Sequence, residues 1–221
     1  MASDDIHNLY IFDCDGVLLD SNALKIDALR AVFMSIEAPI TFVDWAAEEF
    51  RTNFGRTRKQ HFDVFRLYDG SVPFELSPEK MLQAMKLYGE KVELLYENCS
   101  VIPETLSFIS ELSADDQVYV VSASDQSELR NILPSKILGL KKGNIFGGPA
   151  SKVDNILKVI KIAGDKKAVF YGDAVQDARA SIGSGVSFLG LSKYAADRSA
   201  LESFCTENKL LCINSLQDTK N

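Results

Sequence analysis

The sequence predicts an α/β protein built on a doubly wound parallel sheet, with an all-helical segment inserted after the first strand. Two observations lead to this fold class. Short apolar runs alternate with helical stretches over most of the chain, and residues 22–98 show helical patterning without a convincing strand. The chain has 221 residues, a length that fits one large domain or one domain with a smaller insert.

Five apolar runs are expected to form the strands of the sheet. Each run is four residues long, is rich in β-forming residues and is bounded by Gly, Asp, Ser or Asn. The runs are residues 9–12, 118–121, 168–171, 186–189 and 210–213. Continuous apolar runs of this length are typical of strands that are covered on both faces, as in a parallel Rossmann-like sheet.

The inserted segment carries two helical stripes, in which apolar residues repeat at intervals of three and four. One stripe covers residues 26–36 and the other covers residues 81–95. Ser77 and Pro78 form a good helix start, with Ser as the N-cap and Pro at the first helical position. We therefore expect residues 22–97 to form a helical cap domain.

The rest of the chain is expected to form the core. Residues 152–163 and 174–182 are predicted helices that connect successive strands. Because the chain leaves the core after the first strand and returns before the second, the core is discontinuous and consists of residues 1–21 plus 98–221.

Charge and composition exclude some classes of function. The chain has 24 Lys and Arg against 31 Asp and Glu, a net charge of −7, and no basic run, so binding to nucleic acid or to a membrane surface is not expected. No apolar run approaches the ~18 residues that span a bilayer, and the acidic start has no apolar signal core. The four cysteines lack CxxC spacing. We expect a cytoplasmic monomer or homodimer with reduced thiols.

Two carboxylates follow the first predicted strand. Asp13 and Asp15 stand two residues apart at its C-terminal end, and Gly16 comes next. Ligands bind at this end of an open α/β sheet, and alternate residues of an extended chain point the same way. Because like charges this close repel, a shared cation or a proton is expected. Carboxylate oxygens that hold a hard cation suit Mg²⁺.

Further polar groups follow later predicted strands. Asp173 follows the third run, and Asp177 lies one helical turn further on. Ser122 follows the second run, and Lys152 begins the helix before the Asp173 strand. Parallel strands bring these groups to one edge of the sheet. The set suits Mg²⁺-assisted phosphoryl transfer, in which metal and ammonium neutralise phosphate oxygens while a carboxylate attacks phosphorus.

These motifs resemble those of the haloacid dehalogenase-like superfamily, in the phosphatase branch related to phosphoglycolate phosphatase and β-phosphoglucomutase. The first motif, DxDGVLxDS, runs from Asp13 to Ser21, and the fourth, GDxxxDxxAS, runs from Gly172 to Ser181. The resemblance covers essentially the whole chain. It implies a Rossmann-like core, with a helical cap between the first and second motifs that closes over the substrate.

The resemblance also implies a role for each matching residue. Asp13 would be the nucleophile that forms an aspartyl-phosphate, and Asp15 would be the general acid and base. Mg²⁺ would be held by the Asp13 side chain, the Asp15 backbone carbonyl and Asp173, with Asp177 as a further ligand or in contact with one. The residues implied to contact the substrate's phosphate are Gly16, Ser122, Ala123 and Lys152. The substrate would be a small phosphorylated metabolite, such as a sugar phosphate.

One segment of the predicted cap is unusually basic. Four basic residues stand between positions 51 and 59 of a chain whose net charge is −7. Because Arg suits bidentate recognition of anions, we expect Arg56 or Arg58 to contact an anionic part of the substrate. Gly55 would relieve a tight turn. The alternative interpretation is a solvated helix start.

Other functions stay open on the sequence alone. A phosphosugar mutase keeps the same acids, so the motifs do not separate it from a phosphatase. A phosphonatase needs a cap lysine, for which Lys59 is a weak candidate, and a dehalogenase needs neither Asp15 nor a metal. A non-catalytic phosphate-binding protein would also show the acids. The stretch before Lys152 departs from the KPxP form of phosphoglycolate phosphatases, which disfavours glycolate phosphate as substrate.

Several other polar residues are expected to have structural roles. His7 and His61 are too few and too far apart for a metal cluster, and His61 is expected at the surface. Asp20 is expected to cap the helix that leaves the site, with Ser21 beside it. Cys14 should point to the face opposite the acids, into the core.

Overall fold

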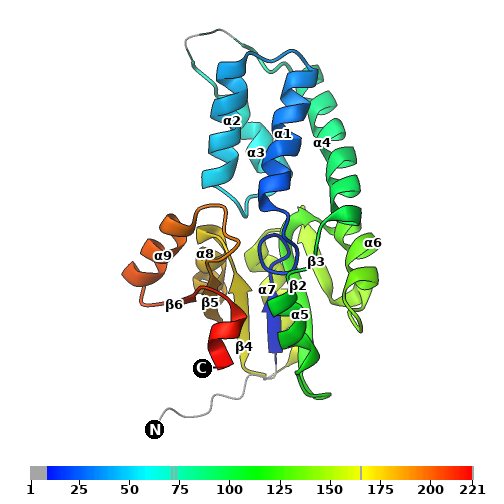
Figure 1. Ribbon diagram of the computed structural model, residues 1–221, viewed down its shortest axis with the longest axis vertical. Helices are drawn as coiled ribbons and strands as arrows, with labels where there is room; N and C mark the ends of the chain where they lie inside the picture. The colour runs from blue at the N-terminus through cyan, green and yellow to red at the C-terminus, as the bar shows by residue number, and fades with distance from the viewer. Residues whose placement is uncertain (1–8, 71, 73, 165, 221) are drawn as a thin grey trace.

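The computed structural model describes residues 9–220 except 71, 73 and 165. Its centre is a six-stranded parallel sheet with the strand order β3-β2-β1-β4-β5-β6 (Figure 1). The strands are β1 (Leu9–Phe12), β2 (Gln117–Asp125), β3 (Ile145–Gly148), β4 (Ala168–Gly172), β5 (Ser187–Leu191) and β6 (Leu211–Ile213). The predicted fold class, a doubly wound Rossmann-like α/β sheet, is confirmed.

The five predicted strands all occur, but β3 is not among the predictions. Half of this strand is glycine, and glycine is a weak strand former, so the local pattern carries no strand signal. β3 lies at the edge of the sheet and pairs with β2, with Ile145 opposite Val120 and Phe146 opposite Val121. Pairing with a neighbouring strand therefore decides the conformation of this segment.

Helices cover both faces of the sheet. The helices on one face are α7 (Lys152–Ala163), α8 (Val175–Ser184) and α9 (Arg198–Glu207). On the other face lie α5 (Pro103–Ser110), α6 (Gln126–Lys136) and the 3-10 helix η2 (Leu216–Lys220), while a second 3-10 turn, η1 (Lys142–Asn144), precedes β3. Alternation along β1 directs Leu9 and Ile11 to the first face and Phe12 to the second.

Residues 22–98 form four helices, which we call the helical insert. They are α1 (Asn22–Ser35), α2 (Ile40–Thr52), α3 (Arg58–Phe65) and α4 (Pro78–Asn98). No strand occurs among the described residues of this segment. The predicted start of α4 is confirmed, because the Ser77 hydroxyl accepts a hydrogen bond from the backbone N–H of Lys80 at 3.3 Å and Pro78 opens the helix. In Figure 1 the insert lies at the top, beyond the C-terminal ends of the strands.

Aromatic side chains hold the insert together. Phe33 is fully buried, with its ring centroid 4.9 Å from that of Phe42 and 5.4 Å from that of Phe65. Edge-to-face pairs of this kind favour a single packing arrangement, and each buried Phe contributes roughly 2 kcal/mol through burial of its apolar surface. The insert therefore has an aromatic core of its own, which is continuous with the core on one face of the sheet.

The topology indicates where a ligand site lies. From β1 the sheet extends to β2 and β3 on one side, and to β4, β5 and β6 on the other. The direction of winding therefore reverses between β1 and β4. In doubly wound sheets, ligands bind at this switch point, outside the carboxyl ends of the strands. Among the described residues, no helix has both the length and the apolar character that crossing a membrane requires.

Candidate functional site

Three buried carboxylates meet at the switch point, and we call them the acid cluster. Asp13 follows β1, Asp173 follows β4 and Asp177 lies in the first turn of α8. Their carboxylate oxygens lie within 4.8 Å of one another, and the residues are 4 %, 2 % and 0 % exposed. The structure therefore brings together three of the acids that the sequence places at strand ends.

Asp13 is the acid of this cluster that has a buried oxygen without a hydrogen-bond partner among the described residues. That oxygen is Oδ1, while Oδ2 lies 3.1 Å from Nζ of Lys152. Burial raises the pKa of Asp13 to about 7, with Asp177 and Asp15 adding to the rise and Lys152 opposing it. Asp13 is thus a buried acid with one oxygen available to a ligand.

Lys152 joins Asp13 to Asp177. It is the first residue of α7, and its ammonium forms ion pairs with both carboxylates. Burial alone would lower the pKa of Lys152, but the two carboxylates outweigh burial and raise it, so the side chain is charged. The other oxygen of Asp177 accepts a hydrogen bond from the backbone N–H of Ala174 at 3.1 Å.

The acid cluster has the chemistry of a divalent-cation site. Burial, together with Asp177 and Asp13, raises the pKa of Asp173 well above its usual value. Asn22 donates one hydrogen bond to Asp173, at 2.6 Å, but brings no charge. If all three carboxylates were ionised beside one ammonium, they would leave negative charge uncompensated in a buried place, and oxygen ligands of this kind suit Mg²⁺.

Asp15 lies apart from the acid cluster, in a set of donors that reach it from several segments of the chain. Lys25 Nζ and the Ser21 hydroxyl donate to it at 2.6 Å, the Ser124 hydroxyl at 2.8 Å and the Tyr96 hydroxyl at 2.9 Å. Burial alone would raise the pKa of Asp15, but Lys25 and the hydroxyls outweigh burial and hold the pKa below its usual value. The carboxylate is therefore ionised and fully engaged.

Four partners of the acids are absent from the sequence predictions: Asn22, Lys25, Tyr96 and Ser124. The pattern of α1 indicates that two of them, Asn22 and Lys25, are unusual. Its buried face consists of Asn22, Lys25, Leu29, Val32 and Phe33, so two polar residues occupy the first turns of an otherwise apolar stripe. A lysine at a buried helix position needs a charged partner. The sequence does not show which carboxylate that partner is.

Gly16 allows the loop after β1 to lie against the acid cluster. Its φ of +73° is in the left-handed region, and a Cβ at this position would overlap the Asp173 carboxylate and the Asn22 amide. Cys14, as predicted, is buried in the core. The loop therefore depends on glycine for both its conformation and its close approach.

The prediction that Asp20 caps α1 is wrong. The N-cap position belongs to Ser21, which makes no side-chain capping bond, and Asp20 is exposed. The Ser21 hydroxyl donates to Asp15 instead. A buried carboxylate without donors destabilises a fold more than an uncapped helix does, so the hydroxyl satisfies the carboxylate.

Ser122 reaches the expected edge of the sheet. The register pairs Phe12 with Val120, so Ser122 lies at the same end of the strands as Asp13. It is buried, and its hydroxyl accepts a hydrogen bond from the backbone N–H of Ser124 at 3.3 Å. A contact between Ser122 and a phosphoryl group stays a prediction.

A cleft of about 430 Å³ opens beside Lys152, between the insert and the core. Its wall includes Gly55, Arg56 and Ala123. Gly55 has the φ of +92° that the predicted tight turn requires, and a Cβ there would lie 2.8 Å from the Cβ of Gln176. The turn between α2 and α3 therefore packs closely on the core.

The predicted anion-binding arginines are paired with carboxylates of this chain. Arg56 Nη1 lies 2.8 Å from Glu49 Oε1. Arg58 Nη2 donates to both oxygens of Glu128, each at 2.8 Å. The charges of both guanidinium groups are therefore offset within the protein, and a contact with an anionic part of the substrate stays a prediction.

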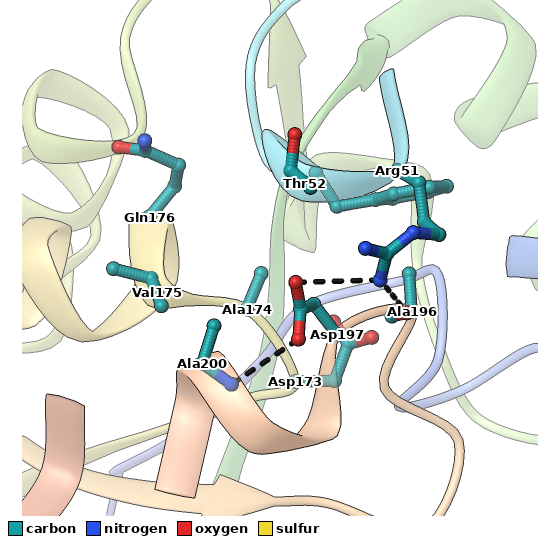
Figure 2. A pocket seen from close by; sticks show the side chains of 10 residues that line it. Arg51, Thr52, Asp173, Ala174, Val175, Gln176, Ala196, Asp197 and Ala200 are labelled. Atoms are coloured by element: carbon teal, nitrogen blue, oxygen red, sulfur yellow. Dashed lines mark hydrogen bonds and ion pairs between the residues drawn. The ribbon is translucent and has the colours of Figure 1, made fainter. Parts of the chain in front are cut away.

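The insert contacts the core on both sides of the acids. On one side, Arg51 Nη1 donates to the backbone oxygen of Ala196 at 3.1 Å and lies 3.3 Å from Asp197 Oδ2, and Figure 2 shows the guanidinium directed at that carboxylate. A cavity of about 20 Å³ lies beside this contact. On the other side, Arg58 of α3 reaches Glu128 of α6. These pairs connect the insert to the core across the site.

His61 is not at the surface, and that prediction is wrong. The side chain is 2 % exposed, with its ring centroid 4.3 Å from that of Phe50. Burial, and then the nearby charges of Arg56 and Lys25, lower the pKa of His61 to about 3. The imidazole is therefore neutral. His7 lies outside the described residues.

The buried His61 is expected to make the protein sensitive to acid. Below the ordinary pKa of 6.5, the unfolded chain binds a proton at this position that the folded chain does not bind, so stability falls as the pH falls from 6.5 towards 3. At about pH 5 this effect amounts to about 2 kcal/mol. Denaturant unfolding of wild type and His61→Gln at about pH 7.5 and about pH 5 should show this extra loss in wild type. An equal loss in both proteins would contradict the burial of a neutral imidazole.

Comparison with known proteins identifies the family. The sequence model of the haloacid dehalogenase-like hydrolases matches residues 7–185. Because the match covers most of the chain and the predicted motifs lie within it, the protein belongs to the haloacid dehalogenase-like hydrolase family. A comparison with curated proteins finds none that matches.

Solved structures share the fold at low sequence identity. A presumed β-phosphoglucomutase from Bacteroides vulgatus has a TM-score of 0.71 and 16 % identity, over 98 % of this chain and 87 % of that chain. A presumed phosphoglycolate phosphatase from Lactobacillus plantarum has a TM-score of 0.68 and 17 % identity, over 97 % and 98 %. CbbY from Rhodobacter sphaeroides, solved in complex with phosphate, has a TM-score of 0.68 and 16 % identity, over 96 % and 95 %.

Proposed function

We propose that this protein is a Mg²⁺-dependent phosphatase that hydrolyses a small phosphorylated metabolite through an aspartyl-phosphate on Asp13. The observation that carries the proposal is the environment of the Asp13 carboxylate. It is buried at the switch point, one oxygen lies 3.1 Å from Lys152 Nζ and the other has no partner among the described residues. An unpartnered carboxylate oxygen suits nucleophilic attack on phosphorus, and the neighbouring ammonium would attract the phosphate oxygens.

The acid cluster fits the metal that the proposal requires. Asp13, Asp173 and Asp177 would hold the ion, together with the backbone carbonyl of Asp15 that the resemblance implies. The bound ion would offset the charge of the carboxylates and of the phosphate oxygens. The Asp15 carboxylate is engaged by other residues, so in the proposal only its backbone contributes to the metal site.

In the first half of the proposed reaction, an oxygen of Asp13 forms a bond to phosphorus as the bond to the leaving-group oxygen breaks. Asp15 donates a proton to that oxygen. In the second half, water attacks phosphorus, Asp15 accepts the proton of the water, and the bond to Asp13 breaks to release phosphate. Lys25 and three hydroxyls favour the ionised form of Asp15, which the second half requires. The first half requires Asp15 to take up a proton.

We propose that the helical insert, residues 22–97, acts as a cap on a core of residues 1–21 plus 98–221. Lys25 of α1 and Tyr96 of α4 contact Asp15 directly, and Arg51 and Arg58 tie the insert to the core on either side. A cap in this position would exclude water from the aspartyl-phosphate and present residues to the leaving group.

The test is phosphate release from purified protein, with a panel of sugar phosphates, phospho-acids, nucleotides and phenyl phosphate. Each reaction is run with Mg²⁺ and with EDTA. We expect release from one class of substrate and from phenyl phosphate, and loss of release in EDTA. A lack of phosphate release from every compound would contradict the proposed phosphatase activity. Labelling of Asp13 by a sugar bisphosphate, without net hydrolysis, would then favour a mutase.

A further inference from the structure

A small cavity beside Lys25 and Ser124 is lined by three residues that each have an unsatisfied polar atom. The cavity has a volume of about 30 Å³, and we call it the inner cavity. Its polar lining residues are Lys25, Arg56, Arg58, His61, Tyr88, Ser124 and Asp125. Arg58 Nε, His61 Nδ1 and the Tyr88 hydroxyl are buried without a hydrogen-bond partner among the described residues. Buried polar atoms of this kind destabilise a fold unless a ligand or water satisfies them.

The inner cavity lies on the side of the site where a leaving group would be. Lys25 and Ser124 line it, and both donate hydrogen bonds to the Asp15 carboxylate. In the proposed function, Asp15 protonates the leaving-group oxygen, so the leaving group must be next to Asp15. The cleft beside Lys152 shares Arg56 and Ala123 with the inner cavity, so the two spaces lie next to each other.

The charged groups around the inner cavity already have partners. Asp125 accepts hydrogen bonds from the backbone N–H groups of Ser127 and Glu128. Lys25 is paired with Asp15, Arg56 with Glu49 and Arg58 with Glu128, at separations of 2.6 to 2.8 Å. The imidazole of His61 is neutral. A second carboxylate or phosphate placed here would lose its hydration without gaining a free cation, which is unfavourable. The lining therefore favours a neutral polar group.

The hydrogen-bonding pattern selects a hydroxyl among neutral groups. Arg58 Nε can only donate, so the ligand must accept a hydrogen bond. The Tyr88 hydroxyl and the neutral His61 ring can each accept a hydrogen bond from the ligand as well as donate one. An alcohol both accepts and donates, whereas a carboxylate only accepts. The volume suits one hydroxylated carbon or about two water molecules.

We propose that the inner cavity binds a hydroxyl group of the substrate's leaving group, so that the substrate is a phosphorylated polyol or sugar and not a phospho-acid. This inference rests on the proposed phosphatase function. Arg58, His61 and Tyr88 set the specificity, and none of them belongs to the acid cluster or contacts Asp15 through an observed hydrogen bond. Arg58 thereby acquires a role different from the anion contact that the sequence suggests.

The first test compares substrates and a minimal variant. The hydroxylated substrates are glycerol, erythritol, ribose and glucitol phosphates. The phospho-acid is phosphoglycolate, whose leaving group has a carboxylate and no second hydroxyl, and phenyl phosphate has neither group. Wild type should use the best hydroxylated substrate at least about tenfold better, in kcat/KM, than phosphoglycolate. Tyr88→Phe should lower kcat/KM for that substrate about tenfold and leave phenyl phosphate within about twofold. Tyr68→Phe is the matched control, because its hydroxyl bonds to Thr41 at the exposed side of the insert.

Two outcomes would overturn the inference. One is a preference of wild type for phosphoglycolate. The other is an equal loss for both kinds of substrate in Tyr88→Phe, which would mean that the unsatisfied atoms hold only water. Failure of the proposed function looks different, because wild type would then not hydrolyse phenyl phosphate at all. In that case calorimetry with the polyol phosphates tests whether the inner cavity binds a hydroxyl. Binding to Asp13→Asn should be about tenfold tighter than binding to Asp13→Asn/Tyr88→Phe.

Discussion

Asp13→Asn is expected to lower metal-dependent phosphate release by at least about 10³-fold, because an amide oxygen cannot replace the attacking carboxylate. The substitution keeps the shape of the side chain. It also removes one of three buried carboxyl groups, whose oxygens lie within 4.8 Å of one another and whose burial and mutual repulsion raise the pKa of Asp13 to about 7. In the metal-free protein the free energy of unfolding should therefore not fall, because like-charge repulsion decreases.

The two readouts together make the Asp13 test specific. Activity is measured as phosphate release with Mg²⁺, and stability is measured by denaturant unfolding in EDTA. Asp63→Asn is the matched control, since Asp63 is an exposed partner of Lys59 and lies outside the site. Full phosphate release by Asp13→Asn would place the nucleophile elsewhere. A large loss of stability would assign Asp13 a structural role.

Lys25→Met is expected to destabilise the protein by about 3 kcal/mol, because it leaves the buried carboxylate of Asp15 without its charged partner. The Lys25 and Asp15 side chains are each 8 % exposed, and Nζ lies 2.6 Å from the carboxylate. Three hydroxyls would still contact Asp15, but they carry no charge to offset its own. Phosphate release should fall as well, since Lys25 positions the residue that we propose as general acid and base.

Lys59→Met provides the comparison for Lys25. Lys59 forms an ion pair with Asp63 on the same insert, but the two side chains are 75 % and 45 % exposed. Ion pairs that are exposed to water contribute less than about 1 kcal/mol to the free energy of unfolding. Denaturant unfolding of both variants should therefore show a loss for Lys25→Met that is clearly greater. Equal losses would mean that hydroxyl donors alone satisfy Asp15.

Local sequence predicts the parts of the fold that depend on local pattern. Apolar runs predict five of the six strands, and helical periodicity predicts α7 with the observed bounds, Lys152–Ala163. The strand β3 could not be predicted in this way, because its glycines have no strand preference and its conformation depends on pairing with β2. The burial of His61 could not be predicted for a related reason, since packing against Phe50 of another helix decides it.

The sequence by itself determines the acids of the site. Asp13, Asp173 and Asp177 follow strands or begin a helix, and parallel strands must bring their C-terminal ends to one edge, so chain order is enough to predict the acid cluster. The partners of Asp15 are a different case. Lys25 and Tyr96 come from two helices of the insert, and only the packing of that insert on the core brings them to one carboxylate. The same packing encloses the inner cavity. Contacts between distant segments depend on the burial of both surfaces together, and a local sequence pattern does not record that burial.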